Sequence, residues 1–99
     1  MVDVSDIPAA RQEEYNQLVR LLLDGAAEPD NASTYRAEWI ARAALEPGHL
    51  WRAMRLNSRD ELKQLLRQYF PEIYAANDKD MRWKKFLYKR MYGWSGFSA

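Results

Sequence analysis

Three basic residues, Arg82, Lys85 and Lys89, follow one another at helical spacing near the end of the sequence. Intervals of three and four residues place them on one face of a helix. The surrounding segment, 80–91, contains five basic and three aromatic residues. Such a row of cations can bind a nucleic-acid backbone, an oxyanion or an acidic protein surface. It is also typical of a solvated helix face above a buried Trp and Phe seam, and the sequence leaves both interpretations open.

His49 is the only histidine and the fourth candidate for an anion or partner contact. One imidazole does not make a metal site, and no His or carboxylate at helical spacing singles out a second ligand. A surface or structural histidine at the start of a helix is the alternative interpretation. We therefore predict no metal site and group His49 with Arg82, Lys85 and Lys89 as candidate binding residues.

No set of residues indicates catalysis. Acidic residues are paired at positions 13–14, 60–61 and 78–80, but each pair lies near an expected helix start, where acids stabilise the helix. The sequence has no cysteine, and we find no Gly-rich phosphate loop or nucleophile elbow in it. We therefore expect a protein that is not an enzyme. Lack of cysteine also excludes thiolate ligands for zinc or iron–sulfur clusters in these residues.

The elements that position these residues are all expected to be helices, because apolar residues recur at intervals of three and four without strand-like alternation. The expected fold is all-α, one domain over residues 1–99 forming a compact, irregular bundle of about five helices. Pro47 and Gly48 either separate the second and third helices or bend a single one. The predicted helices are 7–24, 34–45, 48–55, 58–70 and 79–92, with a short turn at 71–76 and a short aromatic tail at 94–99.

Local signals predict where these helices begin and end. Ser58, followed three residues later by Glu61, forms a capping box and gives the clearest start. The other expected caps are Ser5 or Asp6, Ser33, and Asn77 or Asp78, and the expected stops are Gly25 and Gly93.

The predicted core combines the apolar faces of several helices. The first helix contributes a stripe around Leu18 and Leu22. The second is expected to turn Tyr35, Trp39, Ile40 and Ala43 inward. Most of the core is expected from Leu62, Leu65, Leu66, Tyr69, Phe70, Trp83, Phe86 and Leu87.

Charge is divided between the two halves of the sequence. Residues 1–49 carry four basic and nine acidic residues, and residues 50–99 carry eleven basic and five acidic ones. The halves either attract each other within one fold or orient partners of opposite charge. The net charge of +1 makes nucleic acid an unfavoured partner. We expect no membrane span and a cytoplasmic location, because no long apolar run is present and the N-terminus is unlike a secretory signal.

Several short motifs in the second half carry a family resemblance. They are His49-Leu50-Trp51, Asn57-Ser58-Arg59 with Glu61-Leu62, Phe70-Pro71, and Asn77 with Met81-Arg82-Trp83-Lys84-Lys85-Phe86 and Tyr88. From about residue 41 to residue 91 the sequence resembles the NifQ family of nitrogen-fixation proteins. The run from Met81 to Phe86 is the most specific motif, whereas the acidic half matches only in being helical.

The resemblance implies a molybdenum donor for assembly of the iron–molybdenum cofactor of nitrogenase. It also implies a molybdenum–iron–sulfur cluster held by cysteines in a tail after the basic helix, and no position of this sequence matches such a ligand. The sequence can be a truncation, a short paralogue that kept the scaffold, or a protein whose partner supplies the ligands. Met1 as a natural start favours the short paralogue.

Two functional hypotheses follow. The first is a NifQ-like scaffold without its own cluster, which docks to a protein of cofactor assembly or holds molybdate through Arg82, Lys85, Lys89 and His49. The alternative is a helical interaction module without a metal role, which binds an acidic protein or nucleic acid through its basic C-terminal helix.

Overall fold

The computed structural model describes residues 7–28 and 30–97, with side chains as far as Tyr92. Within these residues all regular structure is helical, which confirms the all-α prediction. The molecule measures 34 × 34 × 26 Å. A short 3-10 helix, η2 (Ala9–Arg11), precedes α1 (Gln12–Asp24), α2 (Asn31–Ala44), α3 (Leu50–Ala53), α4 (Arg59–Tyr69), α5 (Pro71–Ala76) and α6 (Trp83–Phe97).

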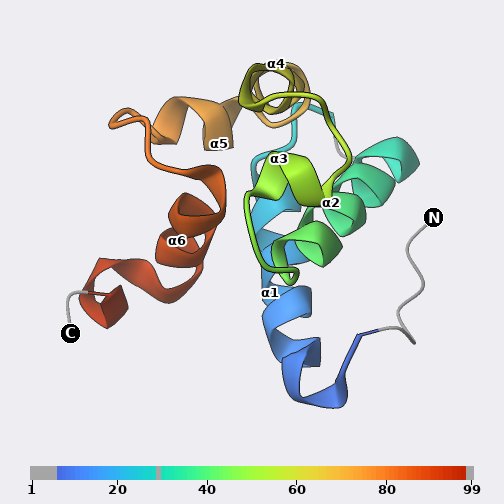
Figure 1. Ribbon diagram of the computed structural model, residues 1–99, viewed down its shortest axis with the longest axis vertical. Coiled ribbons are helices and arrows are strands. Elements are labelled where there is room, and N and C mark those ends of the chain that lie inside the picture. The colour runs from blue at the N-terminus through green and yellow to red at the C-terminus, as the bar shows by residue number, and fades with distance from the viewer. Residues whose placement is uncertain (1–6, 29, 98–99) are drawn as a thin grey trace.

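The helices cross at steep angles rather than forming a parallel bundle. In Figure 1, α1 runs through the centre, α4 is seen almost end-on above it, and α6 lies on the side opposite α2. The chain turns between α2 and α3 at Gly48, whose φ is +89°, so these two helices are separate rather than one bent helix. No helix in the described part of the chain could cross a membrane.

The α2 helix turns small residues, not its aromatic ones, toward the core. Tyr35 is 54% exposed and Trp39 36% exposed, so the inward placement predicted for both was wrong. Ile40 is fully buried, as predicted. Alanine lets helix backbones approach closely, and α1 supplies Leu18 and Leu22 to the same core. Ala43 is buried as predicted, and the buried residues that replace the two aromatic ones are Ala37, Ala41 and Ala44.

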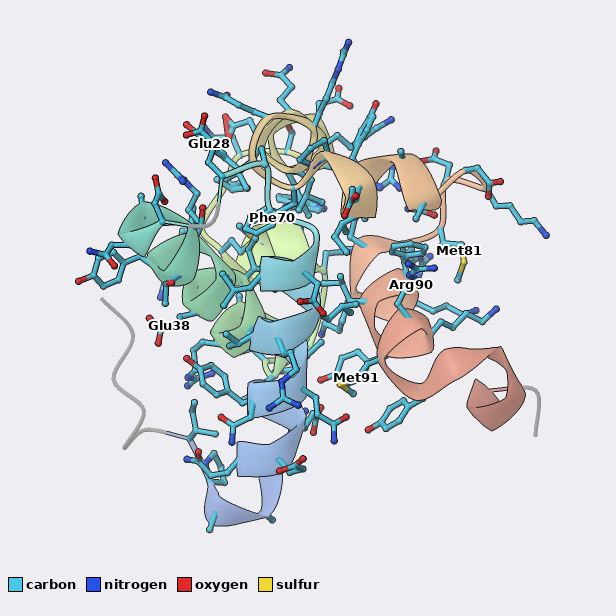
Figure 2. The ribbon with its side chains drawn as sticks, turned by 180° about the vertical axis from the view of Figure 1, so that it is seen from behind. Glu28, Glu38, Phe70, Met81, Arg90 and Met91 are labelled. Atoms are coloured by element: carbon cyan, nitrogen blue, oxygen red, sulfur yellow. The ribbon has the colours of Figure 1, made fainter. Side chains whose placement is uncertain are left out.

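The α4 and α6 helices supply most of the core predicted for them. Leu65 and Tyr69 are only half-buried and pack at its edge. Trp83 stacks on Tyr74 at 6.2 Å between ring centroids and meets Phe86 edge-on at 5.8 Å. Figure 2 places Phe70 in the middle of the molecule, below α4. The confirmed core residues are Leu62, Leu66, Phe70, Trp83, Phe86 and Leu87.

The predicted caps are right at α4 and wrong at α2. At α4, Ser58 Oγ accepts the N–H of Glu61 at 3.3 Å, and the Glu61 carboxylate accepts the N–H of Asn57 at 2.8 Å. At α2 the cap is Asp30, whose Oδ1 accepts the Ser33 N–H at 2.8 Å. Ser33 lies inside the first turn because Asp30, also a strong cap, precedes it at the right spacing. The cap expected at Ser5 or Asp6 lies outside the described residues.

Both ends of α6 differ from the prediction. It begins at Trp83 rather than near residue 79, since Asp80 adopts a φ of +52° and interrupts the helical backbone. It continues through Gly93 to Phe97, so the predicted stop at Gly93 was wrong. Glycine in a helix costs about 1 kcal/mol relative to alanine but does not require a left-handed turn. The predicted aromatic tail therefore belongs to α6 as far as Phe97.

The end of α1 approaches α5 closely. A Cβ on Gly25 would lie 2.7 Å from Cγ1 of Ile73, so this position needs glycine for space. The following loop is tied to the end of α4, where the N–H of Ala27 donates to the Tyr69 carbonyl at 3.0 Å. Arg36 of α2 lies over the Tyr69 ring at 3.7 Å.

The ion pairs of the described residues form within each half of the sequence. Figure 2 shows Glu28 and Glu38 on the α2 side and Met81 and Arg90 on the α6 side. The ion pairs Arg11–Glu14 and Arg42–Glu46 lie within the acidic half, and Arg59–Asp80 and Lys63–Asp80 within the basic half. None of these ion pairs therefore joins the two halves.

Candidate functional site

A groove of about 910 Å³ lies between the start of α3, the start of α4 and the first turns of α6. It brings together three of the four predicted binding residues, His49, Arg82 and Lys85. Lys89 lies one turn further along α6, half-buried and outside the groove. The other lining residues are Gly48, Leu50, Trp51, Arg59, Leu62, Asp80, Trp83, Lys84 and Tyr88.

The floor of the groove is apolar. Leu50, Leu62 and Trp83 are buried core residues that reach it from three different helices. Trp51 is half-buried and stacks with His49 at 6.1 Å between ring centroids. The guanidinium carbon Cζ of Arg52 lies 5.3 Å from the centroid of the Trp51 ring. An occupant would therefore meet aromatic and aliphatic surface below and charge at the rim.

One wall is held by a network around the turn before α6. Arg59 Nη2 donates to Asp80 Oδ1 at 2.9 Å and to the Met81 carbonyl at 3.0 Å. Arg59 thereby holds the pKa of Asp80 below its usual value. The buried Asn77 side chain accepts the Met81 N–H at 2.8 Å and donates to the Met81 carbonyl at 2.9 Å. These bonds position Arg82, the residue directly before α6, and the first turn of α6, which carries Lys85.

The basic residues of the groove divide into those already engaged and those available. Arg59 is paired, and Lys84 Nζ donates to the Glu46 carbonyl across the neighbouring loop. Burial lowers the pKa of Lys84, and the nearby Arg11 charge lowers it further. Arg82 and Lys85 are exposed, and their side chains make no hydrogen bond or ion pair with any described residue. These two charges are therefore free for a ligand.

A second polar cluster, next to the groove, is closed in the sense that its charged and polar groups are already paired with one another. Arg11 donates to both carboxylate oxygens of Glu14, at 3.1 and 2.8 Å, and to the Leu45 carbonyl at 2.6 Å. The Tyr88 hydroxyl of α6 donates to Glu14 and lies 3.5 Å from the Ala44 carbonyl. The hydrogen bond from Arg11 lowers the pKa of Glu14. Burial raises the pKa of Tyr88, and its hydrogen bond to Glu14 raises it further. The cluster joins α1, the end of α2 and α6, and so fixes α6 beside the groove.

The groove does not have the donor set of an iron–sulfur centre. Such clusters need thiolates, and the sequence contains no cysteine. In the part of the chain that the structure describes, no three His, Asp or Glu residues gather as metal ligands. No cluster ligand can be assigned to these residues.

The comparison with known families is decisive for the chain as a whole. The sequence profile of NifQ matches residues 2–99. This chain belongs to the NifQ family. It is 42% identical over 86 residues to "Protein NifQ" of Azotobacter vinelandii, covering 87% of the chain and 44% of that protein. It is 45% identical over 78 residues to "Protein NifQ homolog" of Sinorhizobium fredii, covering 79% and 34% respectively.

The similarity to a third relative covers a comparable part of the chain. "Protein NifQ" of Klebsiella pneumoniae is 37% identical over 87 residues, which cover 88% of the chain and 50% of that protein. No solved structure matches the chain. The NifQ similarity thus extends over the acidic half as well, and the expectation that this half matches only in being helical was wrong. The chain spans about a third to a half of the length of these relatives.

The NifQ motifs and the groove coincide. Of the residues that line the groove, all except Gly48 and Asp80 belong to the segments that carry the resemblance in the sequence. Sequence reasoning selected Arg82, Lys85 and His49 but missed Arg59 and Lys84 as groove residues. Both residues lie within those motifs, so the motifs were the signal that could have identified them. Their contacts to Asp80 and to the Glu46 carbonyl, over 21 and 38 residues, are not visible in helical spacing.

Proposed function

We propose that this chain serves molybdenum supply for nitrogen fixation as a helical scaffold, which docks a protein of iron–molybdenum cofactor assembly in the groove between α3 and α6. Membership of the NifQ family supports the biological setting. The observation that carries the docking role is the gathering of the NifQ motif residues around one groove. No catalytic step is assigned to the chain.

The proposal gives the groove residues different tasks. Arg82 and Lys85 attract and orient the partner, because their charges are exposed and unpaired among the described residues. Trp51 and His49 offer a stacked aromatic contact. Arg59 acts indirectly, by holding the turn at Asp80 and Met81 from which the binding helix starts.

The experiment uses competition in a nitrogen-fixing bacterium that has its own NifQ. Overproduction of the wild-type chain at limiting molybdate should lower acetylene reduction, since the chain occupies the partner without delivering metal. Arg82→Glu combined with Lys85→Glu should remove this interference. The matched control, Arg67→Glu with Lys79→Glu, changes the same charge at exposed positions outside the groove and should interfere as the wild type does.

Two results would overturn the docking role. One is unchanged acetylene reduction at chain levels well above those of the resident NifQ. The other is equal interference by the groove variant and its control. A growth defect of the same size on ammonium, where nitrogenase is not needed, would favour an interaction module without a metal role.

Direct capture of molybdate is the second candidate function, favoured by the exposed charges of Arg82 and Lys85 in one groove. Arg82→Gln with Lys85→Gln should then abolish the heat of molybdate binding in calorimetric titration. Sulfate is the matched probe, because it is a tetrahedral dianion of similar shape. Absence of binding, or equal affinity for both anions, would exclude selective capture.

A further inference from the structure

The groove has two chemically distinct parts, and together they specify an occupant. Its floor is closed by Leu50, Leu62 and Trp83, and its rim carries four basic residues against one acidic residue. We infer that it binds an acidic amphipathic segment of the partner, in which carboxylates flank an apolar side chain. This inference rests on the proposed docking function and names the chemistry of the docked segment.

The charge at the rim requires carboxylates. Among the described residues, Asp80 is the only acid in the groove wall. It is already paired with Arg59 at 2.9 Å and lies 3.9 Å from Lys63. Its charge therefore does not neutralise Arg82 or Lys85. Arg82 directly precedes α6 and Lys85 lies in its first turn, so two carboxylates close together on one segment can meet both cations. Arginine also accepts a carboxylate in bidentate fashion.

The floor requires an apolar side chain. Trp51 packs against the edge of the core and leaves part of its ring accessible. This ring stacks with that of His49, so the two residues offer aromatic surface together. A volume of about 910 Å³ is at the upper end of sites that enclose a drug-sized ligand, and it exceeds the needs of a single oxyanion. A peptide that places an apolar side chain in the groove and carboxylates at the rim uses both parts.

Nucleic acid fits these observations less well. Nucleic-acid affinity comes largely from many phosphate contacts, and only Arg82 and Lys85 are available among the basic residues of the groove. The neighbouring acidic half, with nine acids against four basic residues, would repel an extended phosphate backbone. A protein segment contacts a smaller area and avoids this repulsion.

Selection from a random peptide library displayed on phage tests the chemistry without a presumed sequence. The full 99-residue chain is the target, and sequences that bind the support without the chain are removed. We expect enriched peptides with two or more acids flanking Leu, Ile, Phe or Trp. A fluorescein-labelled synthetic peptide of the enriched sequence should lose at least tenfold in affinity on the Arg82→Gln, Lys85→Gln variant. The Arg67→Gln, Lys79→Gln variant should bind it as the wild type does.

Substitutions in the peptide separate charge from apolar contact. Replacing its acids by amides, or its apolar residues by serine, should each weaken binding at least tenfold. Trp51→Ala should reduce the effect of the apolar replacement. Enrichment of basic or neutral peptides, unchanged affinity on the Arg82→Gln, Lys85→Gln variant, or tighter binding of a short DNA duplex at the same salt would overturn the inference.

Failure of this inference and failure of the proposed docking function would give different results. If the chain interferes with acetylene reduction in the groove-dependent manner but selects no acidic peptide, the docking role stands and the chemistry of the segment is wrong. If acidic peptides bind the groove but the chain does not interfere, the groove binds such segments outside molybdenum supply.

Discussion

Two polar regions beside α6 contain similar residues but differ in whether their charges are paired. Around Tyr88, the charges of Arg11 and Glu14 satisfy each other and join three helices. In the groove, Arg82 and Lys85 have no partner among the described residues. A closed cluster contributes to folding, whereas open charges cost little to the fold and remain available to a ligand. The partners of a charged residue, more than its type or spacing, therefore indicate its role.

The largest expected effect tests the apolar layer on which the groove rests. Trp83 is 4% exposed and lies between Tyr74 and Phe86 below the groove. Trp83→Ala should lower the free energy of unfolding by about 3–5 kcal/mol in urea melts. Trp83→Phe should cost less than half as much, because it keeps the aromatic contact and removes an indole N–H without a described partner. A loss below about 1 kcal/mol for the alanine variant would contradict the core placement.

Breaking the closed cluster should have the next largest effect. Glu14→Gln keeps the shape of the side chain but removes the charge that Arg11 and Tyr88 contact, and should cost roughly 1.5–3 kcal/mol. Tyr88→Phe should cost about 1 kcal/mol, and the double variant less than the sum, since the two residues share a hydrogen bond. Glu13→Gln, one residue away and exposed, is the matched control and should change stability by less than about 0.5 kcal/mol. Strict additivity would show that the cluster does not act as a unit.

Fold elements set by neighbouring residues were predictable, and those set by packing were not. The Ser58–Glu61 cap and the short Pro71–Ala76 element follow from local backbone chemistry. In α2, by contrast, the sequence offers an aromatic stripe and an alanine stripe. Hydrophobicity alone selects Tyr35 and Trp39, but close approach of α1 and α2 selects the alanines. The start of α6 was missed because the Asn77 side chain replaces helical bonds at Met81.

The candidate site was predictable in part for the same reason. Arg82 and Lys85 are three residues apart, which the sequence shows, and His49 joins them in the groove only through the fold. Lys89 has the same spacing but lies outside the groove, because the groove ends within the first turns of α6. Arg59 reaches Asp80 from another helix, and no local pattern encodes such a contact.

The pH dependence of stability should separate the closed cluster from the rest of the molecule. Because the pKa of Glu14 is held below its ordinary value of 4.5, its contribution is present above pH 4.5 and is lost as pH falls through the lowered pKa. The stability difference between wild type and Glu14→Gln should therefore shrink on acidification below that pH. Asp30 and Asp80 also have lowered pKa values, but both proteins contain them and their effects cancel. A difference that stays constant down to pH 2 would show that the Glu14 charge does not stabilise the fold.

At alkaline pH, the contribution of Tyr88 to stability should change in the opposite direction, because it is lost as pH rises. The pKa of Tyr88 is raised above its ordinary value of 10, so its contribution is present below pH 10 and is lost as pH rises beyond it. Tyr88→Phe should remove this alkaline loss, which denaturant melts above pH 10 would measure. Tyr92, which is exposed on the same helix, provides the matched Tyr92→Phe control and should leave the loss in place.

The smallest effect on stability is expected where the effect on binding is largest. Arg82→Gln with Lys85→Gln removes two exposed charges that contact no described residue, so the free energy of unfolding should change by less than about 0.5 kcal/mol. Removing two neighbouring like charges can even stabilise α6 slightly. Arg59→Gln is the informative contrast, because it leaves the turn at Asp80 and Met81 without its guanidinium and should destabilise the fold measurably. If the Arg82 and Lys85 double variant were as destabilised as Arg59→Gln, its charges would belong to the fold, and the distinction between closed and open charges would not hold.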